Sequence, residues 1–255
     1  MRTDSQKAAP LQVLGLGPGA AALLTPAALS GLEASSVIVG YKTYIDLLPK
    51  DLLRGRRVLA TGMRAEIRRV QAATQSALSG EPTALVCSGD PGVYALAGLT
   101  LEYLEKRGIH PDSLPLSIIP GVPALCAAAA LLGAPLTHDF ACVSLSDLLT
   151  PWERIRRRLE AALRADFVLV LYNPRSSRRL SQLAEALALA AEHLAPSTPV
   201  GIVRKAFRPG QSVCISSLAE ADPRQADMFT LLIIGNSETR ITQGPRMLTP
   251  RGYAL

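Results

Sequence analysis

Aromatic residues and long apolar runs are scarce in this chain of 255 residues. Phe, Trp and Tyr together make up 4% of the chain while hydrophobic residues make up 48%, so alanine and leucine must carry most of the burial. The longest apolar run, from Cys126 to Leu136, is interrupted by Gly133 and Pro135 and is shorter than the roughly 20 residues that span a bilayer. The chain is long enough to bury the core of one large domain or two smaller ones. These features predict a soluble globular protein with no membrane partner.

The chain also lacks the spacing of a metal site or a disulfide framework. Its four cysteines are far apart with no CxxC pair, and its three histidines are scattered. We therefore expect no bound metal and reduced thiols, as in the cytosol. The segment 1–10 is polar and has no apolar run typical of a signal peptide, so we expect a short disordered leader and a cytoplasmic protein.

Acidic residues are outnumbered, 21 against 27 lysines and arginines, which leaves a net charge of +6. Such a balance favours anionic partners. The arginines come in short groups, and no long basic run is interleaved with aromatic residues. A nucleic-acid partner is therefore not indicated, and an acidic small molecule remains.

Apolar runs alternate with segments of helical spacing along most of the chain. This alternation predicts an α/β fold of two lobes, 11–119 with a mostly parallel sheet and 120–240 with a mixed sheet, followed by a loosely ordered tail over 241–255. The predicted strands are 11–14, 37–39, 57–60, 84–87, 116–119, 141–144, 167–172, 199–203, 213–216 and 229–234. The predicted helices cover 26–33, 67–80, 93–106, a segment ending at 132, 152–163 and 180–194.

A glycine loop, Gly15 to Gly19, follows the first predicted strand. Its pattern invites comparison with a dinucleotide-binding turn, which needs a helix starting inside the loop and an acidic residue after the second strand. Pro18 has no N–H to offer a phosphate, the next helix starts at Pro26, and the second strand ends at Gly40. Nicotinamide binding is therefore disfavoured, and a simple turn or another small-molecule site remains.

A second turn, Ser88 to Tyr94, follows another buried strand. Ligands of open α/β sheets bind at the carboxyl ends of the strands. Asp90 can accept hydrogen bonds there, and Gly89 lets a ligand approach the backbone. The two turns together favour a small-molecule site at one edge of one sheet.

These two turns, together with Pro120-Gly121, the alanine-rich helix after it and Leu136 to His138, resemble three signatures of the tetrapyrrole (precorrin) methylases. The resemblance runs from Val13 to about Arg240. It implies two α/β lobes with the active-site cleft between them, S-adenosyl-L-methionine as cofactor, a polyanionic tetrapyrrole substrate and a homodimer. Further segments resemble the members that methylate C17 of a corrin precursor and contract its ring: 40–44, 62–66, 138–140, 144–153, 172–176 and 235–237.

The resemblance also implies site residues. The methionine part of the cofactor is expected against one group of residues, Gly89, Asp90, Val93 and Tyr94. The adenosine is expected against a second group, Pro123, Ala124, Tyr172, Asn173, Gly201, Ile202, Gly235 and Asn236. The glycine loop (Gly17, Pro18 and Gly19) is expected to line the macrocycle, and Lys42, Arg64, Arg175 and Arg204 to bind its carboxylates. Two stretches depart from the family pattern, Pro123-Ala124 and 204–210.

Methyl transfer from a sulfonium needs mainly an aligned carbon nucleophile, so the absence of a catalytic triad or metal is compatible with it. Ring contraction also needs a group that moves a proton. Our candidates are His138, Asp139 and Tyr41, with Asp147 and Glu66 behind them, and only the histidine has an ordinary pKa near working pH.

Three alternatives stay open. The resemblance to the family is also compatible with a methylase that acts at another position of the macrocycle. The chain also fits, less well, a nucleotide-dependent oxidoreductase, or a protein that carries tetrapyrroles without catalysis. The sequence leaves open whether the substrate is metal-free or contains cobalt.

Overall fold

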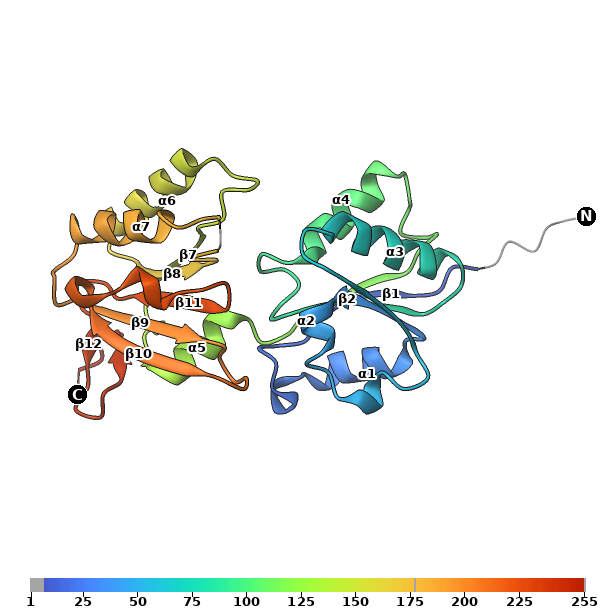
Figure 1. Ribbon diagram of the computed structural model, residues 1–255, viewed down its shortest axis with the longest axis horizontal. Helices are drawn as coiled ribbons and strands as arrows, with labels where there is room; N and C mark the ends of the chain where they lie inside the picture. The colour runs from blue at the N-terminus through green and yellow to red at the C-terminus, as the bar shows by residue number, and fades with distance from the viewer. Residues whose placement is uncertain (1–6, 177, 255) are drawn as a thin grey trace, which may run out of the picture. The chain divides into compact units, whose positions relative to one another are not determined.

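The computed structural model describes residues 7–176 and 178–254. The chain divides into two compact α/β units, an N-terminal unit that ends at Ala124 and a C-terminal unit that starts at Leu125 (Figure 1). The boundary therefore falls at the start of helix α5 (Ala124–Leu132) and not before Pro120. Most of the predicted leader, residues 1–6, lies outside the described residues. The rest of it is not loose, because Ala9 is buried and its N–H donates to the Ala77 carbonyl at 2.8 Å.

The N-terminal unit contains a five-stranded sheet in the order β3-β2-β4-β1-β5, in which every neighbouring pair is parallel. The strands are β1 (Leu11–Gly15), β2 (Val37–Tyr41), β3 (Arg57–Thr61), β4 (Thr83–Cys87) and β5 (Leu116–Ile119). Strands β1, β2 and β4 are almost continuously buried, as expected of parallel strands covered on both faces. The parallel sheet that the sequence predicted is confirmed.

Helices cover both faces of this sheet (Figure 1). Helices α3 (Glu66–Leu78) and α4 (Leu96–Lys106) pack on one face with Val13 and Leu85, and α1 (Pro26–Ala34) and α2 (Lys42–Ile45) pack on the other with Leu14 and Val86. This alternation follows from the period of two along a strand. Thr25 caps α1 by accepting from Ala28 N at 3.2 Å, and Pro26 occupies the first helical position, as the sequence predicted.

The C-terminal unit has a mixed sheet in the order β10-β9-β11-β8-β7, where β7 and β8 are parallel and the other pairs are antiparallel. The strands are β7 (Phe140–Ser144), β8 (Val168–Tyr172), β9 (Pro199–Arg204), β10 (Ser212–Ser217) and β11 (Thr230–Ile234). The mixed sheet is also confirmed.

Two amphipathic helices, α6 (Trp152–Arg164) and α7 (Gln182–Ala191), cover one face of the mixed sheet, and α5 lies on the other face (Figure 1). Ile155, Leu159, Leu183 and Leu187 join the core on the α6 and α7 face. On the α5 face, a Cβ at Gly201 would press on Met247 and on the Leu132 side chain, so glycine there admits close packing. The described residues also contain the short 3-10 turns η1 (Ala21–Leu23), η2 (Lys50–Leu52), η3 (Leu218–Glu220) and η4 (Pro223–Gln225).

The predicted loose tail is wrong for most of its length. Strands β12 (Arg240–Ile241) and β13 (Met247–Leu248) form a small sheet with β6 (Gly133–Ala134). Thr249 is fully buried, and its hydroxyl donates to the Pro135 carbonyl at 2.7 Å. Two-residue strands show no period in sequence, and the partner of β13 in β6 lies more than 100 positions away.

Helix α4 begins at Leu96, later than the Val93 that spacing predicted. Tyr94 has φ +52°, and Ala95 is extended, so neither continues a right-handed helix toward the N-terminus. Within the described residues, no helix is long and apolar enough to cross a membrane.

Candidate functional site

Three loops meet at the carboxyl edge of the N-terminal sheet. They follow β4, β1 and β5, and β1 lies between the other two strands. The loops after β1 and β4 form a two-way bridge: Gly17 N donates to Gly89 O at 3.1 Å, and Gly89 N donates to Gly17 O at 2.7 Å. Both glycines have positive φ, +66° and +65°, which explains why glycine stands there.

Glycine backbones also touch where the three strands end. A Cβ on Gly15 would lie 2.5 Å from Gly121 N and 2.6 Å from Gly89 O, and a Cβ on Gly121 would overlap Gly89 O. Each distance is shorter than any contact a real Cβ makes, and backbone atoms cannot move aside cheaply. The sequence singled out these three glycines, and the structure shows that they are the contact between the loops.

Asp90 joins the loop after β4 to the loop after β5. Its Oδ1 accepts from Gly92 N at 2.8 Å and its Oδ2 accepts from Gly121 N at 3.1 Å. The sequence placed Asp90 at the cofactor, but here both of its carboxylate oxygens serve backbone donors. Tyr94 follows this turn with 54% of its surface exposed.

A small pocket opens beside the glycine loop. Its wall is mostly apolar and comes from the loop after β1 with η1, from α2 and the segment after it, and from the loop after β4. The lining residues are Leu16, Gly17, Gly19, Ala20, Ala21, Leu24, Tyr44, Leu47, Leu48, Pro49 and Ser88. Gly17 and Gly19 of the predicted macrocycle loop therefore line a cavity.

A buried arginine connects several groups beside these loops, at the same end of the N-terminal sheet. Arg69 is 4% exposed, and its Nη1 donates to Thr61 Oγ1 and to Gly62 O, each at 2.9 Å. Its Nη2 donates to Glu66 Oε1 at 2.7 Å, and its guanidinium lies 5.8 Å from the centre of the Tyr41 ring. Glu66 and Tyr41, both considered as proton-moving groups, thus lie around one cation. Sequence reasoning missed Arg69, although its position four residues before Ala73 on the apolar face of α3 signals burial.

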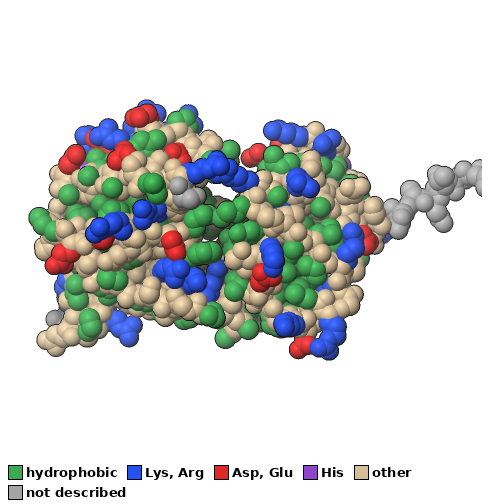
Figure 2. Space-filling view, in the orientation of Figure 1, with side chains coloured by type: hydrophobic (Ala, Val, Ile, Leu, Met, Phe, Trp, Pro, Cys, Tyr) green, Lys and Arg blue, Asp and Glu red, His purple; other side chains and the backbone are tan. Residues whose placement is uncertain are grey.

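The two cations predicted in this unit differ. Lys42 forms an exposed ion pair with Asp46 at 2.8 Å, one helical turn away. Arg64 lies exposed in the loop after β3 with φ +61°. On the visible face, Lys and Arg side chains lie in small separate groups and form no continuous stripe (Figure 2).

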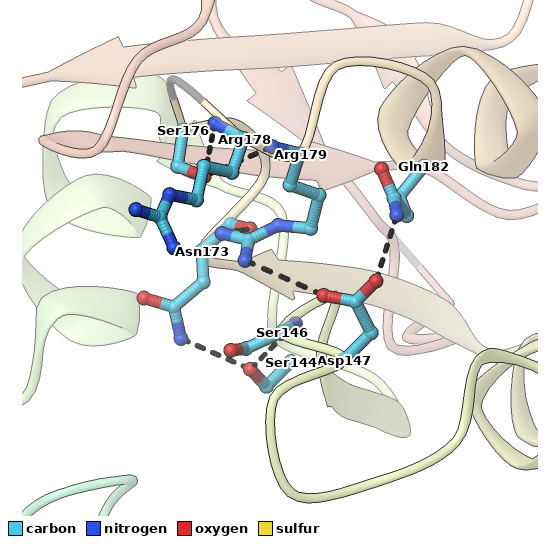
Figure 3. A network of polar contacts seen from close by, with 8 residues as sticks. All are labelled: Ser144, Ser146, Asp147, Asn173, Ser176, Arg178, Arg179 and Gln182. Atoms are coloured by element: carbon cyan, nitrogen blue, oxygen red, sulfur yellow. Dashed lines mark hydrogen bonds and ion pairs between the residues drawn. The ribbon is translucent and has the colours of Figure 1, made fainter.

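In the C-terminal unit, the loops after the parallel strands β7 and β8 share a polar network (Figure 3). Asn173 Nδ2 donates to Ser144 Oγ at 2.9 Å, and Ser146 N donates to the same hydroxyl at 3.2 Å. Arg179 Nη2 donates to Asn173 O at 2.8 Å. Asp147 lies 4.0 Å from Arg179 Nη1 and accepts from Gln182 Nε2 at 2.9 Å.

Burial lowers the pKa of Arg179, and the nearby Asp147 carboxylate offsets part of that effect. The predicted cofactor residues Tyr172 and Asn173 both belong to this edge. Tyr172 Oη accepts from Leu125 N at 3.0 Å, at the start of the C-terminal unit. The sequence treated the arginines from 175 to 179 as one group, so the buried member was not identified.

Arg175 and Arg204, the predicted carboxylate binders of this unit, already have partners. Arg175 Nη1 donates to Arg224 O at 3.5 Å, and Arg204 Nε donates to Asp227 Oδ2 at 2.6 Å. Burial alone would raise the pKa of Asp227, but the Arg204, Phe229 and Thr230 donors outweigh it and lower that pKa.

Four predicted residues lie at the other edge of the C-terminal sheet. His138 and Asp139 precede β7, and Gly235 and Asn236 follow β11, whose end pairs with the start of β8. His138 Nδ1 accepts from Asp139 N at 2.8 Å, and Asn236 Nδ2 donates to Asp166 O at 3.1 Å. A Cβ on Gly235 would press on Thr239. The structure therefore does not bring this group together with Tyr172 and Asn173.

The remaining predicted residues lie in strands or beside the glycine contacts. Gly201 and Ile202 are buried within β9, the first packed on the α5 face and the second in the α6 and α7 core. Pro123 and Ala124 lie next to Gly89, where a Cβ on that glycine would be 3.7 Å from Pro123 Cα and 3.6 Å from Ala124 N. Among the described residues, no group of three or more His, Cys, Asp or Glu side chains is arranged to hold a metal.

Comparison with known proteins supplies the family. Residues 10–222 match the model of the tetrapyrrole (corrin/porphyrin) methylases. The chain is similar to a probable cobalt-factor III C(17)-methyltransferase of Salmonella typhimurium, with 46% identity over 96% of this chain and 100% of that protein. It is also similar to a precorrin-3B C(17)-methyltransferase of a Sinorhizobium species, with 43% identity over 96% of this chain and 97% of the relative.

Among solved structures, the methyltransferase CobJ matches with a TM-score of 0.88 and 38% identity, covering 95% of this chain and 100% of that chain. The similarities to these proteins cover nearly the whole length of the chain, and they agree with the two sheets and the glycine loops described above. The chain belongs to the tetrapyrrole (corrin/porphyrin) methylases.

Proposed function

We propose that this chain transfers a methyl group from S-adenosyl-L-methionine to C17 of a corrin precursor, precorrin-3B or its cobalt counterpart, with contraction of the macrocycle, in cobalamin biosynthesis. The observation that carries the proposal is the 46% identity over the full length of a relative named for C(17) methylation. The second such relative, at 43%, supports the same position on the macrocycle.

The residues present fit the proposed cofactor on one observation of the fold. Gly89 carries no side chain, and the space where its Cβ would lie is bounded at van der Waals distance by Pro123 and Ala124. Bare backbone between two loops at the carboxyl edge of a parallel sheet is a common setting for a nucleoside ligand. From the resemblance to the family, we propose Gly89, Val93 and Tyr94 as cofactor contacts, with Asp90 holding their loop. On the same ground we propose Tyr172 and Asn173 as cofactor contacts.

S-adenosyl-L-methionine, when bound, supplies an electrophilic methyl group on a sulfonium, which is lost from sulfur as the new carbon–carbon bond forms. The task of the protein is then to hold the nucleophilic carbon in line and to exclude water. The close backbone contact between the three loops suits this task, because it restricts movement of the backbone beside the pocket lined by Gly17 and Gly19.

A proton must also move during ring contraction. We propose Tyr41 for this step, because it lies at the same strand ends as the glycine loops and its ring contacts two neighbours. The Arg69 guanidinium lies over the ring, and the Tyr44 ring stands at right angles to it with the two ring centres 5.1 Å apart. His138 and Asp139 lie at an edge of the other sheet, where their contacts are structural. Arg64 is our first choice for a substrate carboxylate, because it is exposed beside this corner.

The test is incubation of the purified chain with S-adenosyl-L-methionine and the trimethylated precursor, with and without cobalt. We expect a mass gain of one methyl group, NMR signals that place it on C17, and loss of the C20 bridge. A methyl group on another carbon would assign the chain to a different position, and calorimetry that detects no cofactor binding would leave only a carrier role.

We further propose a homodimer in the cytoplasm. The support is the resemblance to the family, together with scattered reduced cysteines. Light scattering of the purified protein is expected to give twice the mass of the chain, and a monomer would contradict the proposal.

A further inference from the structure

Arg179 is the most deeply buried cation of the C-terminal unit that the proposed chemistry does not use. Its side chain is 8% exposed, and it comes from the segment between β8 and α7. A buried guanidinium is costly to desolvate unless donors are paired. Here one terminal nitrogen serves the Asn173 carbonyl, and the other faces the Asp147 carboxylate at 4.0 Å.

The carbonyl that Arg179 holds belongs to a residue in an unusual conformation. Asn173 has φ +51°, in the left-handed region, where only glycine is unstrained and asparagine is tolerated. A charged donor on its carbonyl fixes this conformation, and such a hydrogen bond is stronger than a neutral one. The Asn173 side chain is consequently directed toward Ser144, to which it donates at 2.9 Å (Figure 3).

The same guanidinium joins the two loops. Asp147 belongs to the loop after β7, Asn173 to the loop after β8, and Gln182 at the start of α7 donates to the other oxygen of Asp147 at 2.9 Å. The Nε of Arg179 has no partner among the described residues, so the side chain is held by its two terminal nitrogens.

Arg178 provides a contrast one residue away. Its side chain is exposed, and in Figure 3 its guanidinium points away from the network. Only its backbone N–H takes part, donating to Ser176 Oγ at 3.3 Å. Arg178 and Arg179 have side chains of the same charge and length. Comparing variants of the two therefore separates the effect of a buried guanidinium from that of net charge.

We propose that Arg179 is a positioning residue for cofactor binding, which acts through Asn173 by holding its carbonyl and, with Asp147, the two loops at the carboxyl ends of β7 and β8. This rests on the proposed function, in which Asn173 contacts S-adenosyl-L-methionine. Arg179 itself touches neither cofactor nor substrate.

The experiment measures the dissociation constant of S-adenosylhomocysteine by calorimetry, and KM for cofactor and tetrapyrrole, in the full-length protein. We expect Arg179→Met to weaken cofactor binding about tenfold, equivalent to about 1.4 kcal/mol, with a smaller change in KM for the tetrapyrrole. Arg179→Lys keeps the charge but has no fork to reach both partners, so we expect about a threefold loss. Arg178→Met is the matched control and is expected to bind like the wild type.

A double-mutant cycle tests whether Arg179 acts through Asn173. In an Asn173→Ala background, Arg179→Met is expected to add less than a twofold change, because the side chain that it positions is gone. Full additivity would overturn the proposal, as would equal loss for both substrates in the single variant.

The outcomes separate this inference from the proposed function. If the wild-type protein does not bind S-adenosylhomocysteine, the proposed function fails. If it binds and Arg179→Met and Arg179→Lys are within twofold of it, the positioning role fails while the proposed function stands. If Arg179→Met does not fold, Arg179→Lys decides alone, and binding within twofold of the wild type overturns the inference.

Discussion

The loops at the carboxyl ends of the parallel strands are held together in different ways in the two units. In the N-terminal unit, Gly15, Gly89 and Gly121 bring three loops into backbone contact. In the C-terminal unit, the loops after β7 and β8 are joined by side chains around Arg179. Backbone contact leaves no room for adjustment, whereas a side-chain network can lose one member and keep the others. We therefore expect substitutions to act mainly on stability in the first region and mainly on binding in the second.

Gly121→Ala tests the first half of this comparison and has the largest expected effect. Its Cβ would overlap the Gly89 carbonyl oxygen, and relief requires the backbone of one loop to move. Overpacking of this kind costs about 3 kcal/mol. Urea denaturation of the variant measures this loss as a lower midpoint.

Gly98→Ala is the matched control for Gly121→Ala. Gly98 lies in α4, and nothing comes within 4 Å of the place that a Cβ would take, so alanine there is expected to raise stability by about 0.5 to 1 kcal/mol. If both variants change stability equally, backbone contact is not what joins the N-terminal loops.

Cys87 is the last residue of β4, so its alkaline titration tests the packing at the same end of the N-terminal sheet. Burial raises the pKa of this thiol from 9.0 to about 11. Because the folded state holds the proton more tightly, the stabilisation is complete below pH 9 and is lost as the pH rises toward 11. The expected loss is about 2 to 3 kcal/mol.

The measurement compares unfolding free energies of the wild-type protein and Cys87→Ala between pH 8 and about pH 11. Other groups titrate equally in both proteins, so the difference isolates the thiol. Parallel curves would show that Cys87 ionises without cost and that the strand end is open to water.

Asp90→Ala removes two acceptors, one within the loop after β4 and one that ties this loop to the loop after β5. We expect a loss of about 2 kcal/mol, and about half of that for Asp90→Asn, which retains one acceptor oxygen. Thermal unfolding checks both values. An unchanged melting temperature with weaker cofactor binding would restore the role that the sequence assigned to Asp90, direct contact with the ligand.

Ser144→Ala is the smallest change and tests the second half of the comparison. It removes the acceptor for Asn173 Nδ2 and Ser146 N, and the expected loss of stability is about 1 kcal/mol. Cofactor affinity should fall by more than stability alone requires, because Asn173 loses its orientation. Denaturation and calorimetry on the same sample measure the two effects, and a stability loss without an affinity loss would contradict the comparison.

The sequence predicted the strands of the two five-stranded sheets, most helices and the two glycine turns, because each depends on residues close in the chain. Val13, Leu85 and Leu169 lie in short apolar runs, and Thr25-Pro26 is a local signal for a helix start. The start of α4 was placed too early because Tyr94 adopts a left-handed conformation that hydrophobic spacing does not reveal. The short strands β6, β12 and β13 were missed because two-residue strands show no hydrophobic repeat in the sequence.

The candidate site was predicted unevenly for the same reason. The sequence by itself determined that glycine loops end parallel strands and that the family resemblance covers nearly the whole chain. Only the tertiary structure decided that Arg69 and Arg179 are the buried members of arginine groups, that Asp90 serves backbone donors, and that His138 lies at the opposite edge from Tyr172. Burial, pairing and strand direction are relations between distant residues, and a local pattern cannot contain them.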